Sequence, residues 1–199
     1  MSLTNRWLIR IGCFVLGVLV TLVAERMVSA PAASQSSFRS VDRANTTAAI
    51  TQPIAGARRY KDGTGTTVFE VTAPEPKEFP EVVAIETGKK QFTAGDEITI
   101  TEVRGTSSKM AIGNFYQIKG TYKLVSHGPA TLSCYVSARD RENGYGPVRE
   151  SQNTAVTKGE GAFTVVCPLF CRGYPHLTMR AENGAVADVY FGAGEFLSQ

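Results

Sequence analysis

The sequence predicts an all-β fold: an antiparallel β-sandwich, immunoglobulin-like or jelly-roll-like, of about seven to eight strands. Short segments of alternating apolar and polar residues recur from about residue 79 onward. Turn-forming residues separate them about every 8 to 12 positions, and no helix-period segment of useful length lies between them. We expect an N-terminal apolar helix and a disordered tether to precede this domain. A small β-barrel is the alternative fold.

The chain begins with an apolar run over residues 7–24, with Arg6 and Arg10 at its leading edge. We predict that residues 1–25 are an N-terminal transmembrane anchor or a cleaved signal segment. The uninterrupted apolar part, residues 11–24, has about 14 residues, whereas a bilayer span needs roughly 20. Both alternatives leave the basic residues inside and send the rest of the chain across the membrane.

Residues 26–78 are rich in Ala, Ser, Thr and Pro and poor in large apolar side chains. Such a composition buries too little surface to offset its ordering entropy, so we predict a disordered tether. Residues 66–72 alternate like a short strand, but prolines soon follow and interrupt it. The predicted β-sandwich domain then occupies residues 79–199.

The clearest strand pattern lies at residues 116–124, where Tyr116, Ile118, Tyr122 and Leu124 share one side. Gly120 lies on that side as well and indicates a bend or a close approach by a large neighbour. The full set of expected strands comprises residues 82–85, 96–103, 116–124, 131–138, 152–157, 162–167, 176–180 and 186–191.

Three details of these strands are specific enough to compare with a structure. Strict alternation along residues 96–103 places Glu102 on the face of Ile98 and Ile100, and Val103 on the opposite face, which carries hydroxyl groups. Ala138 is expected to point inward. The Asn-Gly pair within residues 182–185 predicts a hairpin between the last two strands.

Cys134, Cys167 and Cys171 are candidates for one disulfide, because thiols outside the cytoplasm tend to pair. Cys134 and Cys167 both fall at inward positions of expected strands, while Cys171 could instead close a small loop with Cys167. Three buried, unpaired thiols are the alternative. The spacing fits neither a redox motif nor, with His176, a zinc site, so we expect no cofactor and no metal.

The residues favour no catalytic mechanism. The two histidines are His127 and His176. His127 follows Ser126, and adjacent side chains on an extended backbone point apart, so we expect no Ser–His dyad. No Gly-x-Ser-x-Gly elbow is present. We therefore predict that the protein is not an enzyme. The net charge of +3 arises from interspersed acids and bases, which argues against a nucleic-acid partner.

A polar excursion between two strands, residues 139–149, is the predicted binding loop. Loops at one end of a sandwich can vary while the sheets stay fixed. An aromatic ring with flanking amides and charges could stack on a sugar or contact a protein; the alternative is a solvated loop without a ligand. The candidate binding residues are Arg139, Arg141, Asn143, Tyr145 and Arg149.

Residues 95–106 read Gly-Asp-Glu-Ile-Thr-Ile-Thr-Glu-Val-Arg-Gly-Thr, and residues 116–122, 158–163 and 175–177 add three further stretches. In these stretches the chain resembles a group of exported bacterial β-sandwich proteins of unknown function, with an N-terminal apolar segment, a variable spacer and one C-terminal β domain. The resemblance covers roughly residues 81–195. It implies a bacterial origin and a periplasmic or surface location, and it brings no known activity.

These observations together lead us to expect a membrane-anchored, non-catalytic binding module of the bacterial envelope. Its partners would be the membrane, through residues 7–24, and an unknown envelope protein or glycan. The C-terminal domain would face the periplasm or the cell surface, or be secreted if the leader is cleaved. A purely structural envelope-assembly domain is one alternative, and an envelope enzyme is the other.

Overall fold

The computed structural model describes residues 54–139 and 143–198, so the apolar run at residues 7–24 lies outside the described residues. The described part consists of β-strands, all paired antiparallel, and two short 3-10 helices, Glu150–Gln152 and Gly194–Phe196. The all-β prediction is confirmed. In this part of the chain, no helix is long and apolar enough to cross a membrane.

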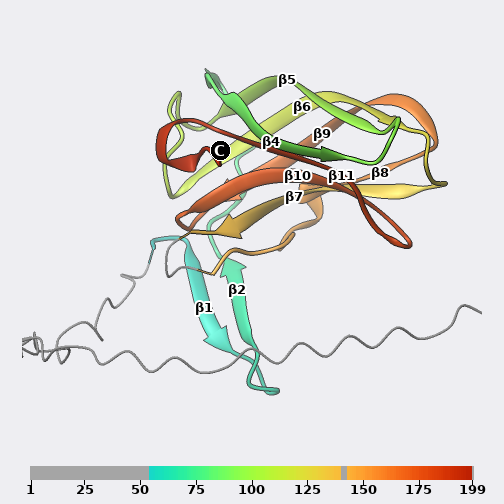
Figure 1. Cartoon of the computed structure of the whole chain (residues 1–199). Coiled ribbons are helices and arrows are strands. Elements are labelled where there is room, and N and C mark those ends of the chain that lie inside the picture. The colour runs from blue at the N-terminus through green and yellow to red at the C-terminus, as the bar shows by residue number, and fades with distance from the viewer. Residues whose placement is uncertain (1–53, 140–142, 199) are drawn as a thin grey trace, which may run out of the picture. The chain divides into compact units, whose positions relative to one another are not determined.

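Two antiparallel sheets face each other (Figure 1). The five-stranded sheet has the order β4 (Glu86–Phe92), β11 (Gly184–Gly192), β10 (Gly173–Ala181), β7 (Ala130–Ala138) and β8 (Asn153–Val156). The four-stranded sheet has the order β3 (Glu81–Val82), β5 (Glu97–Gly105), β6 (Asn114–Leu124) and β9 (Gly159–Leu169). We call these nine strands the two-sheet body.

One hydrophobic core lies between the sheets, and β6 shows how the sequence builds it. Tyr116, Ile118 and Leu124 are fully buried on one side of β6, as the alternation predicted. Gly120 shares this face because the ring of Phe163 fills the space where a side chain would lie. A Cβ atom on Gly120 would lie 2.6 Å from Phe163 Cζ, so the predicted close approach is confirmed.

A β-bulge changes the faces of β5. The pairing of β5 with β6 shifts between Ile100 and Glu102, so that the alternation slips by one residue. Val103 is therefore buried together with Ile98, while Glu102 faces outward to ion pairs with Lys119 and Arg104. The prediction that Glu102 shares the face of Ile98 is wrong for this reason.

Other differences occur at strand ends and edges. Ala138 is exposed, although an inward position was expected, because it is the last residue of β7. Of the first expected strand, residues 82–85, only Val82 is paired as a strand, as part of Glu81–Val82. The edge strand β4 was not predicted, because its Thr-Gly-Lys-Lys-Gln centre has no apolar alternation. The expected hairpin between β10 and β11 is present, with Ala181 paired to Gly184.

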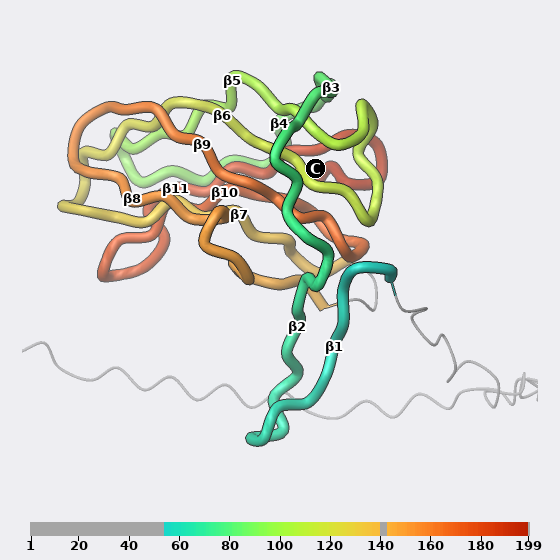
Figure 2. Tube along the Cα trace, turned by 180° about the vertical axis from the view of Figure 1, so that it is seen from behind, coloured from blue at the N-terminus to red at the C-terminus, as the bar shows by residue number. Residues whose placement is uncertain are grey.

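A separate hairpin of β1 (Ala57–Lys61) and β2 (Thr67–Val71) precedes the two-sheet body (Figure 2). Val71 and the partly buried Phe69 form a second apolar cluster with Phe115, Val166 and Phe170. Disorder was predicted throughout residues 26–78, and that prediction is wrong for this hairpin. The hairpin is ordered because it packs against apolar side chains of β6 and the end of β9. Those side chains lie far away in the sequence, so the composition of residues 26–78 does not reveal them.

The contact between Gly120 and Phe163 leads to a stability prediction. Gly120→Ala would force the added methyl group against the Thr99 carbonyl oxygen and the Phe163 ring, and should lower the free energy of unfolding by about 2 kcal/mol or more. Urea unfolding followed by circular dichroism would measure the loss. The matched control is Gly128→Ala, whose added Cβ meets no atom within 4 Å and should leave the midpoint nearly unchanged. Equal midpoints for both variants would contradict the proposed packing.

Candidate functional site

The outer face of the five-stranded sheet carries a row of three aromatic rings. Strand register places Tyr135 of β7, His176 of β10 and Tyr190 of β11 side by side. The His176 ring is stacked between the tyrosines, with centroids 5.5 Å from Tyr135 and 4.6 Å from Tyr190. Such outward rings are held in place by each other and by the sheet, so the row is preorganised for contact with a ligand.

A second row, of hydrogen-bonding side chains, runs beside the rings across the same strands. Ser133 Oγ donates to Asn153 Oδ1 at 2.6 Å, and Thr178 Oγ1 donates to Asp188 Oδ1 at 2.5 Å. Ser133 and Thr178 are buried although they lie on the outer face. Gln91 of β4, which pairs with Asp188, extends the row to the sheet edge. The polar side chains of this row are therefore held in place by packing and by hydrogen bonds to one another.

Two shallow hollows meet on this face. One has a volume of about 240 Å³ and is bordered by the aromatic row with Lys89, Arg180 and Asp188. The other, of about 600 Å³, lies over β7 and β8 and is bordered by Asn153, among others. Tyr135 and Arg180 line both hollows, so the two are adjacent. Together they offer aromatic, hydroxyl, amide and charged groups to one ligand.

Burial and two polar neighbours define the surroundings of His176. Burial lowers the pKa of His176, while the Tyr174 carbonyl and Asp188 oppose that shift to a smaller extent. His176 Nδ1 lies 3.3 Å from the Tyr174 carbonyl oxygen, which can only accept a hydrogen bond. A hydrogen bond to that carbonyl requires the proton on Nδ1, and Ser137 Oγ lies 3.4 Å from the same nitrogen.

The second histidine contacts a serine, contrary to our expectation. Ser126 Oγ lies 2.7 Å from His127 Nδ1, because these residues form a bend rather than an extended strand. Ser126 Oγ also donates to Asp96 Oδ2, and Asp96 Oδ1 accepts the backbone N–H groups of Val125 and Ser126. The serine hydrogen is thus directed at Asp96 and not at the imidazole. A serine nucleophile that histidine activates would instead donate its hydrogen bond to the imidazole. The cluster fixes the turn after β6.

The predicted binding loop is largely turned toward the protein itself. Tyr145, which we expected to face a ligand, is buried: its hydroxyl donates to the Pro168 carbonyl and accepts from Phe170 N, and its ring stacks on Phe69 at 4.1 Å. The interpretation of Tyr145 as a surface residue is therefore corrected. It is a core residue that joins the loop, β9 and the hairpin.

The remaining predicted loop residues also have intramolecular contacts where they are described. Arg149 Nη2 donates to the carbonyls of Val71 and Ala73 and so fastens the end of the hairpin. Arg139 Nη1 bonds Glu195. Asn143 is exposed, and its carbonyl accepts a 2.9 Å hydrogen bond from Arg59. Arg141 lies outside the described residues.

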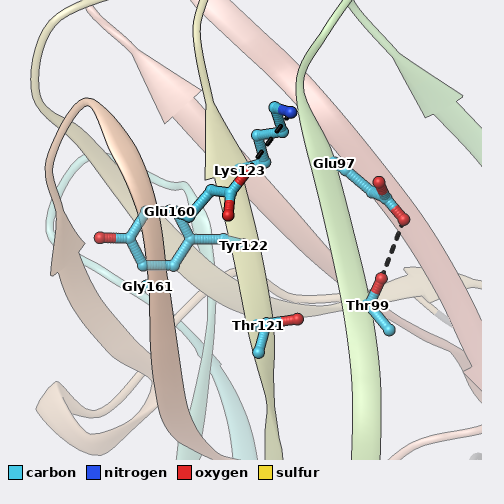
Figure 3. Close-up of a pocket in the computed structure, with 7 residues that line it drawn as sticks. All are labelled: Glu97, Thr99, Thr121, Tyr122, Lys123, Glu160 and Gly161. Carbon is cyan, nitrogen blue, oxygen red and sulfur yellow. Dashed lines mark hydrogen bonds and ion pairs between the residues drawn. The ribbon is translucent and has the colours of Figure 1, made fainter.

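A third hollow, of about 500 Å³, lies on the outer face of the four-stranded sheet (Figure 3). Lys123 is opposite Glu97 on one neighbouring strand and Glu160 on the other, and its ammonium lies 3.3 Å from Glu160. Thr99 Oγ1 donates to Glu97 at 3.0 Å, and Thr121 is opposite Thr99. The expected face of hydroxyl groups is confirmed here. Its charged groups already have partners, and no aromatic row crosses it.

The three cysteines are all buried in the core. Cys134 and Cys167 carry free thiols, so no pairing among the three is present. Cys134 and Cys167 lie on strands of opposite sheets, and both side chains belong to the same core cluster. Among residues 54–139 and 143–198, no group of three His, Cys, Asp or Glu side chains is placed to hold a metal ion.

Comparisons with protein-family models, with curated proteins and with solved structures find no match to this chain.

The turn held by Asp96 should give the protein a pH-dependent stability. Burial, the largest single influence, raises the pKa of Asp96, but hydrogen bonds from Ser126 and Val125 together lower it below its ordinary value. Its stabilisation is therefore complete above the unfolded value of about 3.9 and is lost as pH falls through the lower folded-state pKa. At pH 7, Asp96→Ala should lower the free energy of unfolding by about 2–3 kcal/mol. Denaturant midpoints from pH 7 to pH 2 measure the pH dependence and the cost of the substitution. A difference between wild type and Asp96→Ala that stays constant with pH would contradict this role of the Asp96 carboxylate.

Arg149 should determine how tightly the hairpin is held. Arg149→Ala removes two charge-assisted hydrogen bonds to backbone carbonyls and should weaken docking of β1 and β2 by about 2 kcal/mol. Amide hydrogen exchange would then accelerate in the hairpin more than in β6. The control is Arg58→Ala, which removes an exposed ion pair with Glu70 and a contact with the Tyr60 ring within the same hairpin, and should change little. Uniform acceleration across the whole protein would show that Arg149 is not specific to the hairpin.

Proposed function

We propose that this protein is a non-catalytic binding module of the bacterial envelope. In this proposal the two-sheet body is a β-sandwich, and its five-stranded outer face binds an envelope glycan. The observation that carries the proposal is the row formed by Tyr135, His176 and Tyr190 beside a row of hydroxyl, amide and carboxylate groups.

The chemistry of this face supports a polyhydroxylated ligand of low net charge. Lys89 and Arg180 border the hollows together with Asp188 and Glu182, so cations and anions balance. Hydroxyl and amide groups both donate and accept hydrogen bonds, as sugar hydroxyls require of a partner. Neighbouring strands lie about 4.8 Å apart, so the five strands span roughly 19 Å, enough for several sugar units.

The cellular placement in this proposal rests on the N-terminal sequence. The apolar run at residues 7–24, with basic residues at its leading edge, would anchor the chain with its C-terminal part outside the cytoplasm. A retained anchor would keep the binding face close to envelope polymers, and a cleaved leader would release the same module.

Substitutions on the two outer faces test the proposal. The full-length protein in detergent would be applied to a glycan array, and crosslinked bacterial envelopes would be searched for bound partners. Arg180→Ala and Tyr190→Ala should weaken glycan binding at least tenfold, a loss of about 1.4 kcal/mol or more. Thr121→Ala on the four-stranded sheet is the matched control and should bind like wild type.

Each other result would overturn part of the proposal. Binding of proteins alone would exclude the glycan, and self-association without any ligand would favour a structural role. Binding that Thr121→Ala abolishes and Arg180→Ala leaves intact would move the site to the other sheet. Failure of both methods to return a partner would reject the binding module.

A further inference from the structure

Cys134 and Cys167 meet across the hydrophobic core. Cys134 points inward from β7 of the five-stranded sheet, and Cys167 points inward from β9 of the four-stranded sheet. Both side chains are 0% exposed and belong to one core cluster, and Cys167 is near enough to raise the pKa of Cys134. The fold thus brings together two sulfur atoms from residues 33 positions apart, on the two layers of one core.

The surroundings keep Cys134 as a thiol in the folded, reduced protein. Burial raises the pKa of Cys134, and the neighbouring Cys167 sulfur raises it further. A thiolate is the form that reacts, so the closed core does not favour reaction with a soluble disulfide. Reaction of these cysteines with a soluble disulfide is therefore expected during folding, before the two sheets close on each other.

We propose that Cys134 and Cys167 form an inter-sheet disulfide when the chain folds under oxidising conditions. One cysteine thiolate attacks a small-molecule disulfide, forms a mixed disulfide and releases one small thiol. The other cysteine thiolate then attacks the mixed disulfide and releases the second small thiol. In total, two protein thiols lose two protons and two electrons, and one small disulfide becomes two thiols.

The structure favours this pair over the small loop between Cys167 and Cys171. The backbone between Cys167 and Cys171 is occupied by other contacts: the Tyr145 hydroxyl bonds Pro168 O and Phe170 N, and Gly113 N donates to Leu169 O. A small loop closed between Cys167 and Cys171 would have to disturb these bonds. Cys134, by contrast, lies in the same core cluster as Cys167 and near enough for Cys167 to raise its pKa.

Refolding of the full-length chain tests the pairing. The reduced protein would be unfolded in guanidinium, refolded into detergent with oxidised and reduced glutathione, alkylated, digested and analysed by mass spectrometry. We expect one linked peptide that joins Cys134 to Cys167, with Cys13 and Cys171 alkylated. The chain-entropy model for a loop of this length predicts a melting temperature roughly 10 °C above that of the reduced protein.

Variants separate this pairing from the alternatives. Cys171→Ala should retain the linked peptide and the rise in melting temperature, whereas Cys134→Ala should lose both. A peptide that links Cys171 to either other cysteine would overturn the inference. So would four alkylated thiols in chains whose near-ultraviolet circular dichroism shows native packing, or a disulfide that forms but lowers the melting temperature.

Discussion

The apolar layer between the two sheets positions the side chains of both outer faces, because successive residues of a strand point to opposite sides. On β10, burial of Leu177 fixes the outward direction of His176 and Thr178. A slip of one residue would bury the imidazole and expose the leucine, at a large cost in hydrophobic free energy. The alignment of His176 with Tyr190 on β11 is therefore maintained by side chains on the opposite face of the same sheet.

Sequence reasoning succeeded where one strand carries its own signal and failed where the signal comes from another segment. The pattern from Tyr116 to Leu124 predicts β6, because every second residue must be apolar to fill the core. Nothing in the residues around Ile100 marks the bulge that moves Val103 inward, since one extra residue is set by the partner strand. Order in the hairpin likewise depends on Phe115 and Phe170, which lie more than 40 residues further along.

The candidate site was beyond prediction for the same reason. Tyr145 and Arg149 were expected in a binding loop because they are polar or aromatic residues in a turn-rich segment, yet both bind backbone carbonyls that only the folded chain brings near. The aromatic row requires the register of three strands, and no local pattern links Tyr135 to residues some 40 or more positions away. A useful signal was nevertheless present: Tyr135, His176 and Tyr190 all stand at polar-face positions of expected strands.

The hairpin and the cysteine pair both lie outside the proposed binding face on the five-stranded sheet. The hairpin covers apolar residues on the outer side of β6 and β9, while the polar and aromatic rows cross the five-stranded sheet on side chains of its own strands. Cys134 lies between Ser133 and Tyr135 on β7, and both of these neighbours point outward into the proposed binding face. A covalent link from Cys134 to β9 would therefore fix β7 against the opposite sheet and hold one end of the aromatic row still. Preorganisation of that kind lowers the entropy that a ligand must overcome on binding, without adding a contact to it.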